Sequence, residues 1–389
     1  MSGEIGVTRR AVLKGAAGAV AVTALGGAAS AFASAGSTPL WKTALQRGLI
    51  YGSSWSTRLA GDTDYGALIN RECAILFTED DLLWYQLKPT PDSPLDFSFG
   101  DRFVATAERQ RQLVFGAHLV WDEGFGDGWT EDDLWGMDEQ TARTTLFGTV
   151  RAVVKHYRGR VVAWSCVNEA VDAAEADGLR KDVPWYQTIG PEYVAESFRV
   201  AHAADPHTCL VLNEFGFETD DEWDTAADKR AAALRVIDSL LAQHVPVHAL
   251  GVQAHLRAAD FAAGKFDPRA YKRFLNDVVD RGLAVLVTEL DVLDDGLPAA
   301  NGPRDRGVAD AYKRYLDAAL QVPGVGAVMT FGLSDRYTWL QEDYPRDDGA
   351  PRRPLPYDDQ LKPKPAYNAL STELCQAVRR RQLWRTPRG

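Results

Sequence analysis

The chain is poor in cysteine and in positive charge. Its 389 residues include four cysteines, at positions 73, 166, 209 and 375, and 43 lysines and arginines against 54 aspartates and glutamates. The cysteines show no CxxC spacing and three fall in apolar, strand-like runs. We therefore expect buried thiols, with one disulfide left open as an alternative, and no zinc site or other cofactor. A formal net charge of −11 argues against nucleic acid or an anionic membrane surface as a partner.

Long apolar runs are also lacking. The Gly/Ala-rich stretch 16–29 is short and weakly apolar for a membrane span of about 20 residues. It follows the pair Arg9 and Arg10, and small residues at 33–35 offer a cleavage site. Residues 1–35 therefore resemble a twin-arginine export signal, although Val12 stands where that pattern usually has Phe. We expect a periplasmic or extracellular protein, with an uncleaved anchor helix as the alternative.

The mature chain, 36–389, reads as one α/β domain, a single (β/α)8 TIM barrel with elaborated loops. Segments of helical period, such as 192–204, 226–243, 271–281 and 310–320, separate most of the apolar strand-like runs. Eight alternating units predict a closed parallel barrel, and we read 341–365 as a loop of it. The eight predicted strands are 48–55, 73–79, 113–121, 161–169, 209–216, 248–256, 283–291 and 326–335.

Most of these strands turn polar or aromatic only at their C-terminal ends. That edge of a parallel barrel carries the active site. The residues at these ends are Glu79, Trp121, Asn168, Asn213, Gln253, His255, Glu289 and Asp335. Glu169 and Glu289 follow buried runs directly, on the fourth and seventh predicted strands. Two carboxyl groups about 5–5.5 Å apart are what glycosidic hydrolysis with retention requires, one as acid and one as nucleophile.

Eight motifs in order then make the chain resemble glycoside hydrolase family 10, the endo-β-1,4-xylanase family. They are GAHLVW, HYRGRVVAWSCVNEAV, GLRKDVPWYQTIGPEYVAESFRVAHAADP, LNEFGFE, GVQAHL, VTELDV, FGLSDRYTWL and KPAYNAL. The resemblance implies that Glu169 is the general acid/base and Glu289 the nucleophile. It also implies that Asn168 hydrogen-bonds the sugar 2-hydroxyl beside the cleaved bond.

The same resemblance places Gln253 and His255 beside the nucleophile, with Asp291 orienting the imidazole. We expect that imidazole to be neutral and to donate one hydrogen bond to the ionised Glu289. Glu169 must instead hold a proton at working pH.

Further positions are implied to bind substrate. Trp121 and Trp339 match aromatic residues that stack on sugar rings, and Glu79, Asp80 and Phe331 match other sugar contacts. The tryptophans at 84, 129, 135 and 185 could belong either to the core or to the site. His118 has no matching role, so we expect a structural one.

The chain departs from the family pattern on the non-reducing side of the cleaved bond. EDDLLW puts Asp80 where the family has Asn and Leu83 where it has Lys, and GAHLVWD puts Ala117 and Asp122 at two histidine positions. Phe331 replaces a Trp. Because alternate strand residues face opposite sides, His118 should not stand in for the histidine missing at Ala117.

These departures favour a retaining β-glycosidase that cleaves a β-1,4-linked polysaccharide whose glycone is not plain xylan. The negative charge of Asp80 argues against a glucuronate at the glycone position. The alternative is an ordinary secreted endo-β-1,4-xylanase. A non-catalytic carbohydrate-binding barrel is less favoured, because a chain that had lost activity would have accumulated substitutions at the cleavage residues as well, and these residues are present. We expect a monomer whose only partner is a polysaccharide or oligosaccharide.

Overall fold

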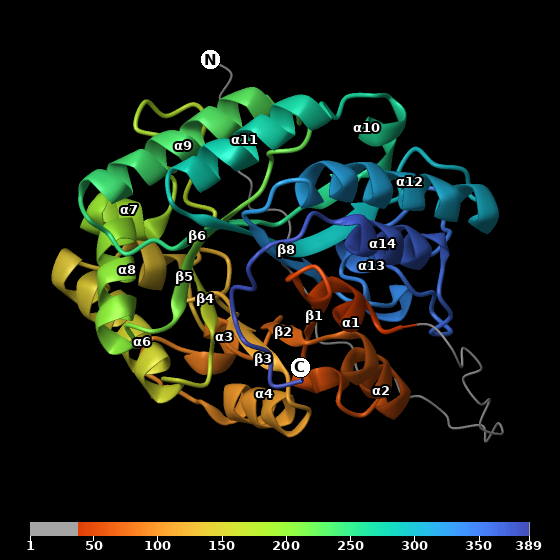
Figure 1. Cartoon of the computed structure of the whole chain (residues 1–389). Coiled ribbons are helices and arrows are strands. Elements are labelled where there is room, and N and C mark those ends of the chain that lie inside the picture. The colour runs from red at the N-terminus through yellow and green to blue at the C-terminus, as the bar shows by residue number, and fades with distance from the viewer. Residues whose placement is uncertain (1–37, 389) are drawn as a thin grey trace, which may run out of the picture.

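A computed structural model describes residues 38–388, in which eight parallel strands close into a barrel (Figure 1). The ring closes because β1 pairs with β9 and β6 pairs with β8. The expected export signal, 1–35, lies outside the described residues. The barrel strands are β1 (Ile50–Trp55), β2 (Ile75–Thr78), β3 (Leu113–Gly116), β4 (Ala163–Asn168), β5 (Cys209–Glu214), β6 (Ala249–Val252), β8 (Ala284–Leu293) and β9 (Val325–Thr330).

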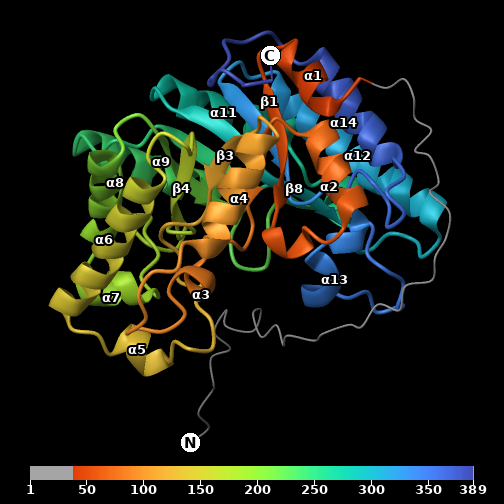
Figure 2. The ribbon, with the colours of Figure 1, turned by 90° about the horizontal axis from the view of Figure 1, so that it is seen from below.

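Helices surround this ring and cover its outer face, as the two ribbon views show (Figures 1 and 2). The larger helices are α1 (Leu40–Leu45), α2 (Thr63–Glu72), α4 (Ser98–Arg109), α6 (Glu139–His156), α8 (Glu192–Ala204), α9 (Ala226–Ala242), α11 (Pro268–Asp280), α12 (Asn301–Leu320) and α14 (Pro365–Gln376). Short helices lie in the connections: α3 (Trp84–Leu87), α5 (Glu131–Trp135), α7 (Pro184–Ile189), α10 (Ala258–Ala262) and α13 (Leu340–Asp343), with 3-10 turns at Thr57–Leu59 and Asp335–Tyr337. The predicted TIM barrel is confirmed.

The barrel strands are buried on both faces, which explains their nearly continuous apolar sequence. One set of side chains, including Ile75, Phe115, Val211 and Met329, fills the inside of the ring. The alternate set packs against the surrounding helices. No helix of residues 38–388 has the length and apolarity that crossing a bilayer demands. The four cysteines are free thiols, of which Cys73 and Cys166 are buried.

Several predicted strands end earlier than the apolar runs suggested. The run 113–121 stops being a strand at Gly116, and the run 248–256 breaks after Val252. Ala254 then has φ 62°, and the chain resumes as the short β7 (His255–Arg257), which pairs with the end of β8. These breaks all lie at the C-terminal edge of the barrel, where side chains must leave the regular alternation to reach a site.

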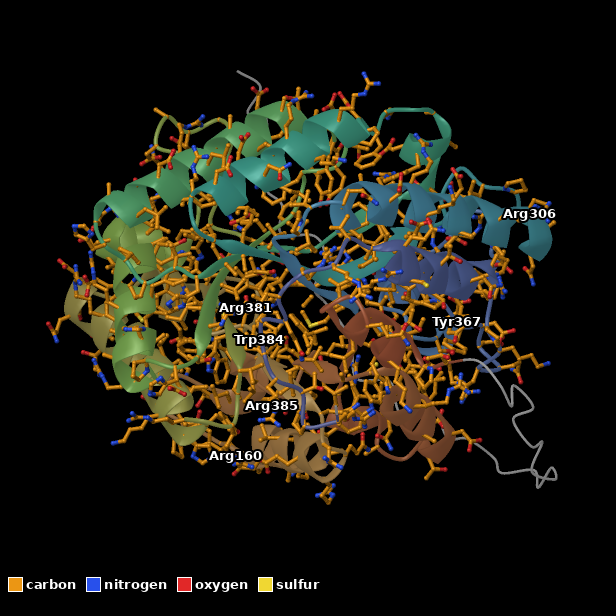
Figure 3. All side chains as sticks on the ribbon, viewed as in Figure 1. Arg160, Arg306, Tyr367, Arg381, Trp384 and Arg385 are labelled. Carbon is orange, nitrogen blue, oxygen red and sulfur yellow. The ribbon has the colours of Figure 1, made fainter. Side chains whose placement is uncertain are left out.

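The last residues close the opposite end of the barrel. After α14 the chain runs back across this end, and Arg380 N–H donates to Arg47 O at 3.0 Å. Trp384 packs against the side chains inside the ring. Figure 3 shows Arg381, Trp384 and Arg385 along this segment, near the middle of the view. In Figure 2 the C-terminus lies at one end of the molecule, and α3, α5 and α13 lie at the other.

The predicted loop 341–365 is held to the end of β8 by a buried carboxylate. Asp294 is fully buried, and its Oδ1 accepts a hydrogen bond from Arg352 Nη1 at 2.9 Å. Arg346 Nη1 donates to the Asp294 carbonyl at 2.6 Å. Buried ion pairs of this kind fix geometry more reliably than they add stability. The loop therefore has a defined position beside the strand that carries Glu289.

Candidate active site

Two irregular places in the sheet present the two glutamates. β4 has a register shift between Ser165 and Val167, and Glu169 follows the strand with φ 56°. This left-handed conformation is uncommon for a residue with a side chain and is held by the surrounding hydrogen bonds. Glu169 N–H donates to Asn213 O at 3.0 Å, and Arg180 Nη1 donates to Glu169 O at 3.2 Å. Glu289 lies in the second irregularity, between Val287 and Leu290 of β8.

A chain of side-chain hydrogen bonds joins these two carboxylates. Gln253 Nε2 donates to Glu169 Oε1 at 2.9 Å and contacts Asn168 Oδ1 at 3.3 Å. Asn213 Nδ2 donates to the same Asn168 oxygen at 2.8 Å and to Glu289 Oε1 at 2.7 Å. The predicted residues Asn168, Glu169, Gln253 and Glu289 are therefore brought together, with Asn213 as the link between them.

The surroundings of Glu289 favour its charged form. His255 Nε2 lies 3.4 Å from Glu289 Oε2, and His255 Nδ1 lies 2.9 Å from Asp291 Oδ1. Burial lowers the pKa of His255, but Asp291 and then Glu289 outweigh it and raise the pKa to about 10. Burial likewise raises the pKa of Glu289, but the His255 hydrogen bond and nearby histidine charge bring it below the usual 4.5. His255 is thus an imidazolium, and the predicted neutral imidazole is wrong.

Two tryptophans hold carboxylates through their indole nitrogens. Trp121 Nε1 donates to Glu169 Oε2 at 3.1 Å, and Trp339 Nε1 donates to Asp291 Oδ2 at 2.7 Å. Both side chains remain partly exposed, so a ring face is available to a ligand. For four other tryptophans the sequence did not decide between the core and the site. Those at 84, 129 and 185 are buried in one aromatic cluster, whereas Trp135 is 39% exposed.

A row of rings crosses the mouth of the barrel between these tryptophans. Ring centroids lie 5.3 Å apart for Trp121 and His118, 5.8 Å for His118 and Phe77, and 6.1 Å for Phe77 and Phe331. Phe331 in turn lies 5.6 Å from His255. The row therefore runs from the residue that holds Glu169 to the residue that holds Glu289.

His118 lies among these rings, next to Trp121 and Phe77. The strand alternation that placed it on the outer face does not apply, because β3 ends two residues earlier. Its Nδ1 lies 2.7 Å from Ser165 Oγ, on β4. Burial lowers the pKa of His118, while the charges of Glu289 and Glu169 act against that shift.

The two aspartates that depart from the family pattern each have an arginine partner. Arg58 Nε lies 2.9 Å from Asp80 Oδ2, and Arg58 Nη2 lies 3.0 Å from Glu79 Oε1. Asp122 pairs with Arg180, both largely buried. Burial and then Asp80 raise the pKa of Glu79 to about 7, and burial raises the pKa of Asp122 to about 6. The added anions are therefore compensated within the site.

Several of these residues had no role predicted from the sequence. Asn213 stood among the polar strand ends, which was its only signal. Arg180 lies in a matched motif but in a loop, and Arg58 follows β1 in a 3-10 turn, where no periodicity identifies a partner. Their roles depend on contacts between separate loops and strands, such as Arg58 with Glu79 across 21 positions and Arg180 with Asp122 across 58, which a local pattern does not contain.

Comparison with known proteins agrees with this geometry. The family model for glycosyl hydrolase family 10 matches residues 40–373. A beta-1,4-xylanase of Dictyoglomus thermophilum is 30% identical over 318 residues, covering 78% of this chain and 82% of the relative. Endo-1,4-beta-xylanase 5 of Pyricularia oryzae is 29% identical over 350 residues, covering 89% and 80%. The crystal structure of native xylanase 10B from Thermotoga maritima superposes with a TM-score of 0.76 at 26% identity, covering 87% of this chain and 98% of that one.

Proposed function

The chain belongs to glycosyl hydrolase family 10, and we propose that this glycoside hydrolase cleaves the backbone of β-1,4-xylan with retention of configuration. The chemistry is a double displacement. Glu289 attacks the anomeric carbon while Glu169 gives its proton to the leaving oxygen, which leaves a glycosyl ester on Glu289. Glu169 then takes a proton from water, and that water releases the sugar from the ester.

The observation that carries this proposal is the unequal surroundings of the two linked carboxylates. Glu289 accepts from Asn213 and faces the His255 cation, so it stays ionised and nucleophilic. Glu169 accepts hydrogen bonds from the neutral donors Trp121 Nε1 and Gln253 Nε2. Two carboxyl groups in different environments can take the acid and the nucleophile roles.

The substrate contacts follow from the same geometry. Asn168 receives both of its protein hydrogen bonds on Oδ1, so its Nδ2 can donate to a sugar hydroxyl. Trp121, Trp339 and Phe331 offer ring faces for sugar stacking. Glu79 and Asp80 would contact the sugar on the non-reducing side.

We also propose that residues 1–35 direct export, since a polymeric substrate stays outside the cell. The relatives are named xylanases, and one solved structure of a xylanase 10B from Thermotoga petrophila RKU-1 is a complex with xylobiose, at 25% identity and a TM-score of 0.76. Residues 36–389 would form the mature enzyme, acting as a monomer.

A second candidate function is the hydrolysis of a different β-1,4-glycan, one whose sugar on the glycone side of the cleaved bond is not plain xylose. The Glu79–Arg58–Asp80 cluster favours it, because this arrangement replaces the Asn and Lys of the family pattern. A product assay of residues 36–389 on a panel of β-linked polysaccharides, with Glu289→Ala as control, separates the two. Release from plain xylan supports the first candidate, and release from another glycan alone supports the second. Inactivity on the whole panel would sink both.

A further inference from the structure

His118 is a buried imidazole in the middle of the row of rings that crosses the barrel mouth. The side chain lies between Trp121, which donates to Glu169, and Phe77, which leads through Phe331 to His255. The other rings between Trp121 and His255 are phenylalanines. His118 therefore contributes the polar group to this part of the row, which is otherwise apolar.

One nitrogen of this imidazole is fixed and the other is available. Nδ1 lies 2.7 Å from Ser165 Oγ, and Ser165 is fully buried. His118 is 8% exposed, and among residues 38–388 no group hydrogen-bonds its Nε2. Nε2 is therefore the atom of this imidazole that can take a partner from outside the protein, in a side chain that lies beside both carboxylates.

The chemistry of a neutral imidazole fits a sugar hydroxyl. The Ser165 hydroxyl can donate to Nδ1, which leaves the proton on Nε2 and makes that atom a donor. Burial lowers the pKa of His118 and so favours the neutral ring, while the charges of Glu289 and Glu169 oppose that shift. A pyranose hydroxyl lying over an aromatic floor accepts such a hydrogen bond.

We propose that His118 Nε2 hydrogen-bonds a hydroxyl of the sugar whose glycosidic bond is cleaved. This makes His118 a substrate-binding residue for that sugar, and the inference rests on the proposed function. This hydrogen bond would hold the sugar ring against the row of aromatic rings and fix the orientation of the sugar relative to Glu289.

Matched substitutions test the contact. In His118→Gln the side-chain amide reaches the position of Nε2. In His118→Asn the shorter amide reaches the position of Nδ1 and keeps only the Ser165 contact. His118→Phe keeps an aromatic ring without either nitrogen. Losing one such hydrogen bond lowers kcat/KM on 4-nitrophenyl β-xylobioside by about 10- to 100-fold. We expect that loss in the Asn and Phe variants, and a loss below about fivefold in the Gln variant.

Deoxy analogues of the same substrate identify the hydroxyl. The wild-type enzyme should discriminate about tenfold or more against the analogue that lacks the contacted hydroxyl, and His118→Phe should treat that analogue and the parent alike. Equal discrimination by both enzymes at every position would overturn the proposal. If the wild-type enzyme hydrolyses no xyloside, it is the proposed function that fails.

A direct measurement serves if the variants do not fold. The chain has seven histidines, so ¹⁵N-histidine labelling of the Glu289→Ala protein resolves their ring nitrogens. Adding 4-nitrophenyl β-xylobioside should shift the His118 Nε2 resonance. A resonance that stays in place at saturating ligand would contradict the contact.

Discussion

Arg58 and Asp80 form an ion pair, with 2.9 Å between Arg58 Nε and Asp80 Oδ2. Arg58 comes from the turn after β1, whereas Asp80 follows β2, so the pair joins neighbouring strand ends. Tyr85 also donates to Asp80 Oδ1 at 2.7 Å. The anion that distinguishes this chain from the family pattern is thus tied to the scaffold on both oxygens.

Replacing Arg58 should weaken catalysis by disturbing this cluster. In Arg58→Ala the carboxylates of Asp80 and Glu79 repel each other without a cation between them, so the glycone-side sugar binds less well. Because the Arg58 side chain is 60% exposed, we expect a limited fall in kcat/KM of about tenfold on xylo-oligosaccharides. The control is Arg281→Ala, which removes a partly exposed arginine paired with Asp238 at 2.7 Å, away from the site. Equal activity of the two variants would refute a role for Arg58.

His255 should set the acid limb of the pH profile. Its positive charge keeps the pKa of Glu289 below 4.5, so kcat/KM of the wild-type enzyme should fall only below about pH 4.5. In His255→Asn the cation is gone and burial raises the pKa of Glu289. The acid limb then moves to higher pH, by about one unit or more. An acid limb that stays in place in this variant would show that His255 does not hold the charge of Glu289.

The C-terminal segment should contribute to stability but not to chemistry. Trp384 packs on the side chains inside the barrel at the end opposite the site. Trp384→Ala should lower Tm by about 2–6 °C through lost apolar contact, with kcat/KM on xylo-oligosaccharides unchanged. Leu383→Ala, at a more exposed position of the same segment, should change Tm less. A loss of activity in the folded Trp384 variant would contradict this division.

The sequence predicted those parts of the site that depend on strand ends. Glu169, Glu289 and Gln253 follow apolar runs, and a parallel barrel gathers such ends at one edge whatever the loops do. The place of His118 among the rings did not follow from strand alternation, because β3 stops at Gly116 and the length of an apolar run does not reveal where the strand stops. The charge of His255 was misjudged because it depends on two carboxylates at once.

The loops account for what the sequence could not predict. Asp80 and Asp122 stood out in the sequence only as departures from the family pattern, since Arg58 and Arg180 reach them only through the folded connections between strands. The closure of the far end by Trp384 had no signal either, because the segment after α14 has no regular period. A barrel sequence defines its strands and their order well and defines its loops poorly.

Retaining cleavage by Glu289 and Glu169 is tested most directly by the anomeric form of the first product. We would follow the hydrolysis of xylohexaose by residues 36–389 with ¹H NMR, using Glu289→Ala as control. The β-anomer should appear first and equilibrate slowly with the α-anomer, and the control should release nothing. An α-anomer formed first, or release that persists in Glu289→Ala, would contradict the double displacement.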